Sequence, residues 1–174
     1  EGFAPDGLAG ASVRDIARRA GVRVSTLYHY FPSKEAIYQE VQSRVDAQIR
    51  EIMLGVLAKG LDLRETTREA LGRIFDFFLA NRPYAQLAFR SCLEEGEGLS
   101  PDAERGLAHR WLGFAEGALK PAEAQGLVKG LDLAPFIVSM DALMHWHVVN
   151  DATYRRLLGK GVEDPDVARR IREH

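Results

Sequence analysis

Apolar residues recur at helical spacing along almost the whole chain, and no convincing alternation of apolar and polar residues indicates a strand. The first clear helix follows Ser12, a good N-cap, and ends at Gly21. Its apolar face comprises Val13, Ile16, Ala17 and Ala20. A second, very short helix is expected from about Val24 to Tyr30. The pattern predicts an all-α protein.

A long helix is expected after the break at Pro32-Ser33, with the serine as its N-cap. Its apolar stripe comprises Ile37, Val41, Val45, Ile49, Ile52 and Val56. Later helices should start at Asp62 with Glu65, at Pro83 as first helical residue, at Ser100-Pro101, at Asp132 and at Asp164-Pro165. Gly96-Glu97-Gly98 should end one of them, Pro121 should kink another, and the helix from Asp132 should reach about Asn150. A small N-terminal unit is therefore followed by a larger helical bundle.

Segment 12–35 has the features of two helices that cross at a tight turn. Ala17 is the small residue needed at the crossing, and Gly21 tolerates the positive φ that the turn requires. Helical spacing turns Leu27 and Phe31 inward. The outer face of the short helix then consists of Ser25, Thr26, Tyr28 and His29. Such side chains can hydrogen-bond phosphates and base edges.

The distribution of charge strengthens this interpretation. A net charge of −2 excludes a uniformly basic nucleic-acid coat, but not a local basic patch. Around the short helix only Asp15 opposes the positive residues before Glu35, and these are Arg14, Arg18, Arg19, Arg23 and Lys34. The alternative is that the arginines form a solvated face and that Tyr28, Tyr30 and Phe31 are core aromatics. The full combination is more specific than any one of these features.

The segment resembles the DNA-binding signature of the TetR family of bacterial repressors. That signature ends in Thr-Leu-Tyr-x-Tyr-Phe-x-x-Lys-Glu, which this chain has at 26–35, and Ile16-Ala17 and Ala20-Gly21-Val22 match as well. Phe3-Ala4 with Gly7 resembles the end of the family's first helix, so the helix-turn-helix unit is expected to have a truncated first helix, and both chain ends to be trimmed. The resemblance implies a three-helix DNA-binding domain over 1–40 and a ligand-binding and dimerisation domain over 41–174.

By this resemblance the short third helix would enter the major groove of double-stranded DNA. Phosphate contacts would come from Thr26, Tyr28 and Lys34, with Ser12 holding another phosphate at a helix N-terminus. Base reading would fall chiefly to Arg14. Weaker candidates are Arg23, Val24, Ser25 and His29, and Tyr30 completes the predicted set. Arg23 stands where the family often has a small polar residue, which could add a phosphate contact or alter the preferred sequence.

The resemblance also implies a homodimer. Helices over 132–152 and from 165 onward would form a four-helix contact between subunits, and the dimer would read a palindromic operator. A ligand would tilt the long helix and change the separation of the two recognition helices. Candidate ligand-binding residues are Phe78, Phe89, Trp111, Phe114, Met144 and His145, although a large side chain in such a helix is more often a packing residue than a ligand contact. The predicted function is a repressor released by a small apolar or aromatic effector.

Composition and motifs also bear on whether the chain is a disulfide-bonded, metal-binding, membrane or enzymatic protein. Cys92 is the only cysteine, which excludes an internal disulfide and a cysteine-based zinc site, and a cytoplasmic location is expected. No apolar run reaches the roughly 20 residues of a membrane helix. His145 and His147 point about 200° apart on a helix, so no metal and no other cofactor is predicted. An enzyme is not predicted, because no nucleophile elbow or phosphate-binding loop is evident. A helical interaction module that has lost DNA binding is the remaining alternative.

Overall fold

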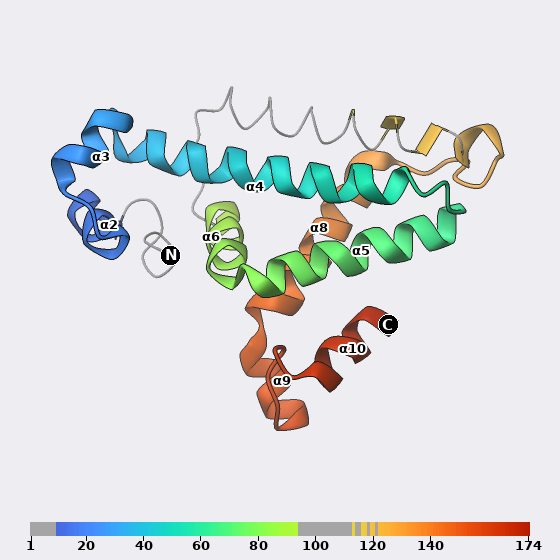
Figure 1. The fold of residues 1–174 in the computed structure, drawn as a ribbon. Helices are drawn as coiled ribbons and strands as arrows, with labels where there is room; N and C mark the ends of the chain where they lie inside the picture. The colour runs from blue at the N-terminus through green and yellow to red at the C-terminus, as the bar shows by residue number, and fades with distance from the viewer. Residues whose placement is uncertain (1–9, 94–112, 114–115, 118, 121) are drawn as a thin grey trace.

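A computed structural model describes residues 10–93, 113, 116–117, 119–120 and 122–174. Within these residues all regular structure is helical, which confirms the predicted fold class. The helices are α2 (Val13–Ala20), α3 (Val24–Tyr30), α4 (Lys34–Leu57), α5 (Leu63–Ala80), α6 (Arg82–Leu93), α8 (Leu133–Val149), α9 (Asp151–Leu158) and α10 (Pro165–Glu173). Helices α2 and α3 lie at one end of the long α4, and α9 and α10 lie beyond the far side of α5 (Figure 1). No helix in the described ranges is long and apolar enough to span a membrane.

The turn between α2 and α3 forms as predicted. The Ser12 hydroxyl oxygen accepts hydrogen bonds from the backbone N–H groups of Arg14 and Asp15, which caps α2. Gly21 ends the helix with φ 68°, in the left-handed region that favours glycine. Ala17 is 1% exposed, as the helix crossing requires. Ala20, expected on the inner face, is exposed instead, because α2 is covered on one narrow stripe only.

The small N-terminal unit, which we call the head (residues 10–38), shares its core with the rest of the chain. Ala11, Ile37 and Tyr38 form a buried cluster together with Leu87 of α6. Three partly buried residues of the helix-turn-helix pack on this cluster: Ile16, Leu27 and Phe31. The predicted inward orientation of Leu27 and Phe31 is confirmed, whereas the contribution of α6 was not predicted. The head is thus attached to the body by the continuous helix α4 and also by a packed leucine.

The larger unit, which we call the body, is built on the pair α4 and α5 with α6 and α8 packed against α5 (Figure 1). Ser33 caps α4 through the N–H of Ala36, and Asp62 caps α5 through the N–H of Glu65, both as predicted. The predicted stripe of α4 is buried at Ile37 and Val56 and partly buried between them. The main core comprises Phe75, Phe78, Ala85, Val148, Val162 and Ala168. Burial of these apolar side chains fixes the helices that carry the candidate ligand residues.

The C-terminal helices differ from the prediction at one point. Asp132 and Asp164 cap α8 and α10 as expected, through the N–H groups of Ala134 and Asp166. Between them, however, the chain bends at Asn150 and forms the separate helix α9. The α6 prediction is also displaced by one residue, because the helix starts at Arg82 and places Pro83 second.

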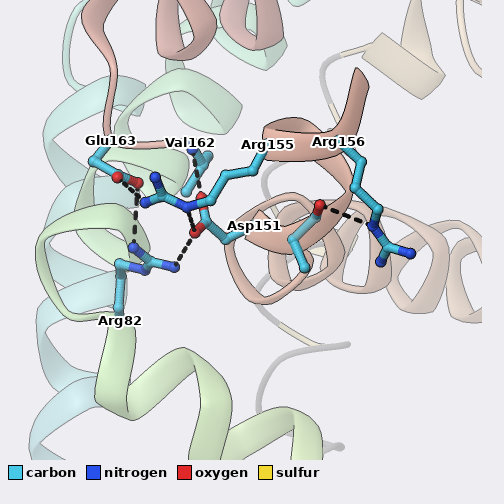
Figure 2. Close-up of polar contacts among 7 residues, drawn as sticks. Arg82, Asp151, Arg155, Arg156, Val162 and Glu163 are labelled. Atoms are coloured by element: carbon cyan, nitrogen blue, oxygen red, sulfur yellow. Dashed lines mark hydrogen bonds and ion pairs between the residues drawn. The ribbon is translucent and has the colours of Figure 1, made fainter. Parts of the chain in front are cut away.

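A network of charged groups holds the α9–α10 loop against the start of α6 (Figure 2). The Asp151 carboxylate accepts hydrogen bonds from Val162 N–H and Arg155 Nε, each at 2.7 Å. Arg82 Nη2 lies 3.6 Å from the same carboxylate, and Arg82 Nη1 lies 3.4 Å from Glu163. Arg155 also pairs with Glu163. Although Asp151 is partly buried, these interactions hold its pKa below the ordinary value against the opposing effect of burial.

Several expectations fall on residues outside the described ranges. These are the end of the first helix near Gly7, the helix end at Gly96-Glu97-Gly98, the helix start at Ser100-Pro101, the kink at Pro121, and the ligand candidates Trp111 and Phe114.

Candidate nucleic-acid interface and effector site

The outer face of α3 is open to solvent as the sequence predicts. Ser25, Thr26, Tyr28, His29 and Tyr30 are all exposed, with Tyr28 at 52% and Tyr30 at 72% of their full surface. His29 and Tyr30 contact each other edge to face, with ring centroids 5.2 Å apart. The alternative that Tyr28 and Tyr30 are core aromatics is therefore wrong.

The basic residues around α3 are not equivalent. Arg14 and Arg23 are exposed, and no ion pair within the described part of the chain involves either. Arg18 instead pairs with Asp15 at 2.6 Å, which reduces its contribution to the patch. Lys34 is the first residue of α4 and is partly buried. Arg14, near the capped end of α2, and Arg23, at the start of α3, are therefore exposed positive groups open to a polyanion.

Two predicted contacts have less accessible groups. The Ser12 oxygen is already the acceptor of the α2 cap, so only its hydroxyl hydrogen can be donated to a phosphate. Val24 is half-buried. Among the predicted set, exposure therefore favours the polar groups of α3 and the two arginines over these two residues.

The candidate effector residues that the structure describes lie on three helices. Phe78 of α5 is 2% exposed, and its ring centroid lies 4.2 Å from that of His145 on α8. Phe89 of α6 is half-buried and contacts Trp146, with ring centroids 5.9 Å apart. Met144 is half-buried within the main core. The three helices α5, α6 and α8 all pack against one another, and we call this region their junction.

His145 is the one buried polar residue of the described core. Its Nδ1 lies 3.0 Å from the Asp141 carbonyl oxygen and 3.2 Å from the Asp141 carboxylate. Burial by itself lowers the pKa of His145, but the hydrogen bonds and charge of Asp141 outweigh it, and the pKa is raised above the ordinary value. Its Nε2 is buried and has no hydrogen-bond partner in the described residues.

His147 has a different environment. Its Nδ1 lies 2.5 Å from the hydroxyl oxygen of Tyr154 on α9, and its pKa is lowered by burial and by the nearby His174. The two histidines of α8 thus have separate partners. Within the described ranges, no three His, Cys, Asp or Glu side chains are grouped so that they could hold a metal ion.

Large apolar side chains are exposed on both α8 and α9, and together we call them the exposed apolar surface. Its residues are Val138, Leu143, Trp146, Leu157 and Leu158, which are 37–75% exposed. Helix α8 is apolar on nearly every side, as expected for a helix covered all round. These residues have the composition of an interface. Those of α8 lie on a helix predicted for dimerisation, whereas Leu157 and Leu158 lie outside both predicted segments.

Comparison with known proteins agrees with the helix-turn-helix interpretation. Residues 1–41 match the family model described as bacterial regulatory proteins, tetR family. The HTH-type transcriptional repressor KstR2 of Mycobacterium tuberculosis is 35% identical over 79 residues, which cover 45% of this chain and 36% of that protein. The repressor of the same name from Rhodococcus jostii is 39% identical over 64 residues, covering 37% of this chain and 31% of its own length. The chain therefore aligns with well under half of these relatives.

Solved structures are similar over almost the whole chain. The TetR family transcriptional regulator PfmR of Thermus thermophilus has a TM-score of 0.68 at 22% identity, covering 98% of this chain and 90% of that one. A structure solved in work on the control of antibiotic production by bacterial hormones has a TM-score of 0.63 at 26% identity, covering 99% and 88%.

Fold and site together define an all-α protein with a helix-turn-helix head on a helical body. Residues 1–41 match the model of the tetR family of bacterial regulatory proteins, and the fold is similar to that of a solved TetR family regulator. The predicted recognition is thereby confirmed, and the match to a family of regulators agrees with the expectation that the chain is not an enzyme.

Two residues that support the candidate sites were not identified in the sequence analysis. Leu87 lies among many apolar residues of α6, and nothing in the periodicity distinguishes a leucine that enters the head core from one that enters the body core. Asp141 stands four residues before His145, and this helical spacing is the signal that could have identified the pair.

Proposed function

We propose that this protein is a homodimeric transcriptional repressor that binds a palindromic operator and is released by a small apolar or aromatic effector. The observation that carries the proposal is the exposed outer face of α3, with its hydroxyl, phenol and imidazole groups, above a packed inner face. This arrangement leaves the helix supported from behind and free to enter a major groove. A cytoplasmic location, where the chromosome is accessible, belongs to the same proposal.

The contacts with DNA divide by chemistry. Thr26, Tyr28 and Lys34, with Ser12, bind phosphates and set the register of the head. Arg14 reads a base edge, where a well-placed arginine contributes about 1–3 kcal/mol of discrimination. The other members of the proposed interface are Arg23, Val24, Ser25, His29 and Tyr30. Arg14 and Arg23 are exposed and have no ion pair in the described part of the chain, which supports this division.

In this proposal residues 1–40 bind DNA, and residues 41–174 bind the effector and form the dimer. Helix α4 crosses this boundary without interruption, and Leu87 packs into the head. A change in the body can therefore reach the head through two rigid connections. The exposed apolar surface of α8 and α9 supports a dimer contact, and the aromatic junction of α5, α6 and α8 supports an apolar effector.

The test is selection of binding sites from random double-stranded DNA by the full-length protein, followed by measurement of affinity over a range of salt concentrations. Enrichment of a palindrome supports a dimeric sequence reader. Lys34→Ala should weaken binding to every sequence and reduce the log–log salt slope by about 0.9, because one phosphate contact is lost. Arg64→Ala removes an exposed arginine of α5 and is the charge-matched control. Failure to enrich any sequence at low salt would favour the interaction module.

A further inference from the structure

The Nε2 atom of His145 is a buried polar atom whose hydrogen-bonding capacity is unused. His145 is 7% exposed, and Nε2 has no partner in the described part of the chain. Buried polar atoms in folded proteins are paired in the large majority of cases, because burial without a partner forfeits the hydrogen bonds made to water. An aliphatic side chain at position 145 would fill the apolar contact between α5 and α8 without leaving a polar atom unpaired. The unused nitrogen therefore points to a partner that is not part of the chain.

The chemistry of that partner follows from the opposite side of the ring. Nδ1 lies within hydrogen-bond distance of the Asp141 carbonyl oxygen and of the Asp141 carboxylate. Both groups can only accept hydrogen bonds, so Nδ1 carries the proton. In the neutral ring Nε2 is then an acceptor, with its lone pair directed away from Asp141.

The surroundings of the ring define the rest of the partner. The Phe78 ring packs beside the imidazole, with centroids 4.2 Å apart, and Tyr84 stacks on Phe78 in turn, with Phe78–Tyr84 centroids 6.2 Å apart. Met144, the preceding residue of α8, is half-buried in the same core. These groups favour an apolar or aromatic body. A ligand here would offer one hydrogen-bond donor on an otherwise apolar skeleton.

We propose that His145 Nε2 recognises the effector through an O–H donor, so that the effector is an alcohol or phenol with an apolar body. This inference rests on the proposed effector site and specifies the class of molecule that enters it. His147 has no such role, because its Nε2 is not a buried atom without a hydrogen-bond partner in the described residues. Substitution of His147, two positions away on the same helix, is therefore the control for substitution of His145.

The test uses phenol, anisole and toluene, which share one ring and differ in donating an O–H, carrying only an acceptor oxygen, or having no oxygen. Binding is measured by NMR titration of the full-length protein with ¹⁵N-labelled histidine, at about pH 8.5. Because the pKa of His145 is raised, its ring resonances are first followed over pH to establish that the ring is neutral under these conditions. Phenol should bind about five- to tenfold more tightly than anisole or toluene, the advantage of one buried hydrogen bond. The Nε2 resonance of His145 should shift with phenol only.

Variants separate recognition from packing. His145→Phe keeps a ring against Phe78 but has no acceptor, and it should bind the three probes about equally. His145→Gln retains an acceptor oxygen near the position of Nε2 and should restore part of the preference for phenol. His147→Phe should leave the preference unchanged. Circular dichroism and thermal unfolding of each variant establish that the comparison is made on folded protein.

Each possible result either supports or overturns the assignment of His145. A phenol preference that disappears in His145→Phe and persists in His147→Phe supports it. Equal binding of the probes, binding of none, a preference unaffected by His145→Phe, or a proton found on Nε2 in the free protein would each overturn it. DNA binding is measured on the same preparations. Absence of the phenol preference with intact DNA binding rejects the His145 assignment alone, whereas absence of DNA binding rejects the proposed function.

Discussion

Gly161 lies where charged side chains of the α9–α10 loop converge. A Cβ atom at this position would be 2.5 Å from Asp151 Oδ1 and from Glu163 Oε2, and 2.6 Å from Arg155 Nη2. Only Glu163 and Arg155 can move aside easily, because the Asp151 carboxylate is held by the N–H of Val162 at 2.7 Å. Glycine is therefore required at position 161 because the surrounding ion pairs leave no room for a Cβ atom, and not because of its backbone conformation.

Gly161→Ala should therefore lower the free energy of unfolding by about 1–2 kcal/mol, the effect of leaving a partly buried hydrogen bond unmade. Urea denaturation measures the change. Gly55→Ala is the control, because a Cβ there meets nothing within 4 Å and alanine is the better helix former by about 0.5–1 kcal/mol. An unchanged stability in Gly161→Ala would mean that the network is not needed to hold the loop.

Asp141 determines the ionisation of His145. Burial lowers the pKa of His145, and the hydrogen bond and charge of Asp141 raise it by more. Asp141→Asn keeps an acceptor but removes the charge, so the His145 pKa should fall, which NMR titration of the ring measures.

The effect on stability has a definite sign. A raised pKa in the folded state stabilises the fold below the unfolded value of about 6.5, and this contribution is lost as the pH rises through the folded pKa. The stability difference between the original protein and Asp141→Asn should accordingly be larger at about pH 5.5 than at about pH 8.5. A pH-independent difference would contradict the role of Asp141.

At the scale of helices, local signals predicted most of the starts and stops. Ser12, Ser33, Asp62, Asp132 and Asp164 all cap the helices assigned to them, because a cap depends only on the side chain and the next three N–H groups. The orientation of α3 was also predictable, because Leu27 and Phe31 together determine which side of so short a helix faces the core.

Helix α9 could not be predicted in the same way. No glycine or proline marks the bend at Asn150, and apolar residues continue across it. The bend is accompanied by tertiary contacts, since Asp151 binds the N–H of Val162 and lies 3.6 Å from Nη2 of Arg82, which belongs to a distant part of the sequence. Periodicity describes one helix at a time and contains no information on such pairs.

Helix α6 connects head and body through Leu87, which is 4% exposed among residues of the head. Leu87→Ala should destabilise the fold by about 2–5 kcal/mol, because it removes buried methyl groups and leaves a cavity. Leu54→Ala is the matched control, since Leu54 of α4 is 54% exposed and its truncation should change stability by less than about 0.5 kcal/mol. Chemical denaturation compares the two, and equal effects would show that the head does not depend on α6.

For the molecule as a whole, the sequence predicted the proposed DNA-binding face more fully than the proposed effector site. The residues of α3 act from one short helix, so their exposure follows from its two faces. His145 and Phe78 lie on α8 and α5 and meet only when the body has folded. The unused Nε2 of His145 is a property of that packing, and the sequence could indicate only that large side chains were present.

The proposed dimer makes a prediction that links the two ends of the molecule. Val138 and Leu143 of α8 are 67% and 47% exposed, so a charge at either position costs little within one subunit. If their surface is the subunit contact, Val138→Glu or Leu143→Glu places charges in an apolar interface and should weaken dimerisation at least tenfold, or about 1.4 kcal/mol. Analytical ultracentrifugation measures this, with Leu54→Glu as a control for an exposed leucine elsewhere. Because each head contacts only one half-site, the dimer-weakened variants should lose affinity for a palindrome while half-site binding is retained. A dimer that survives both substitutions would place the contact on a different surface.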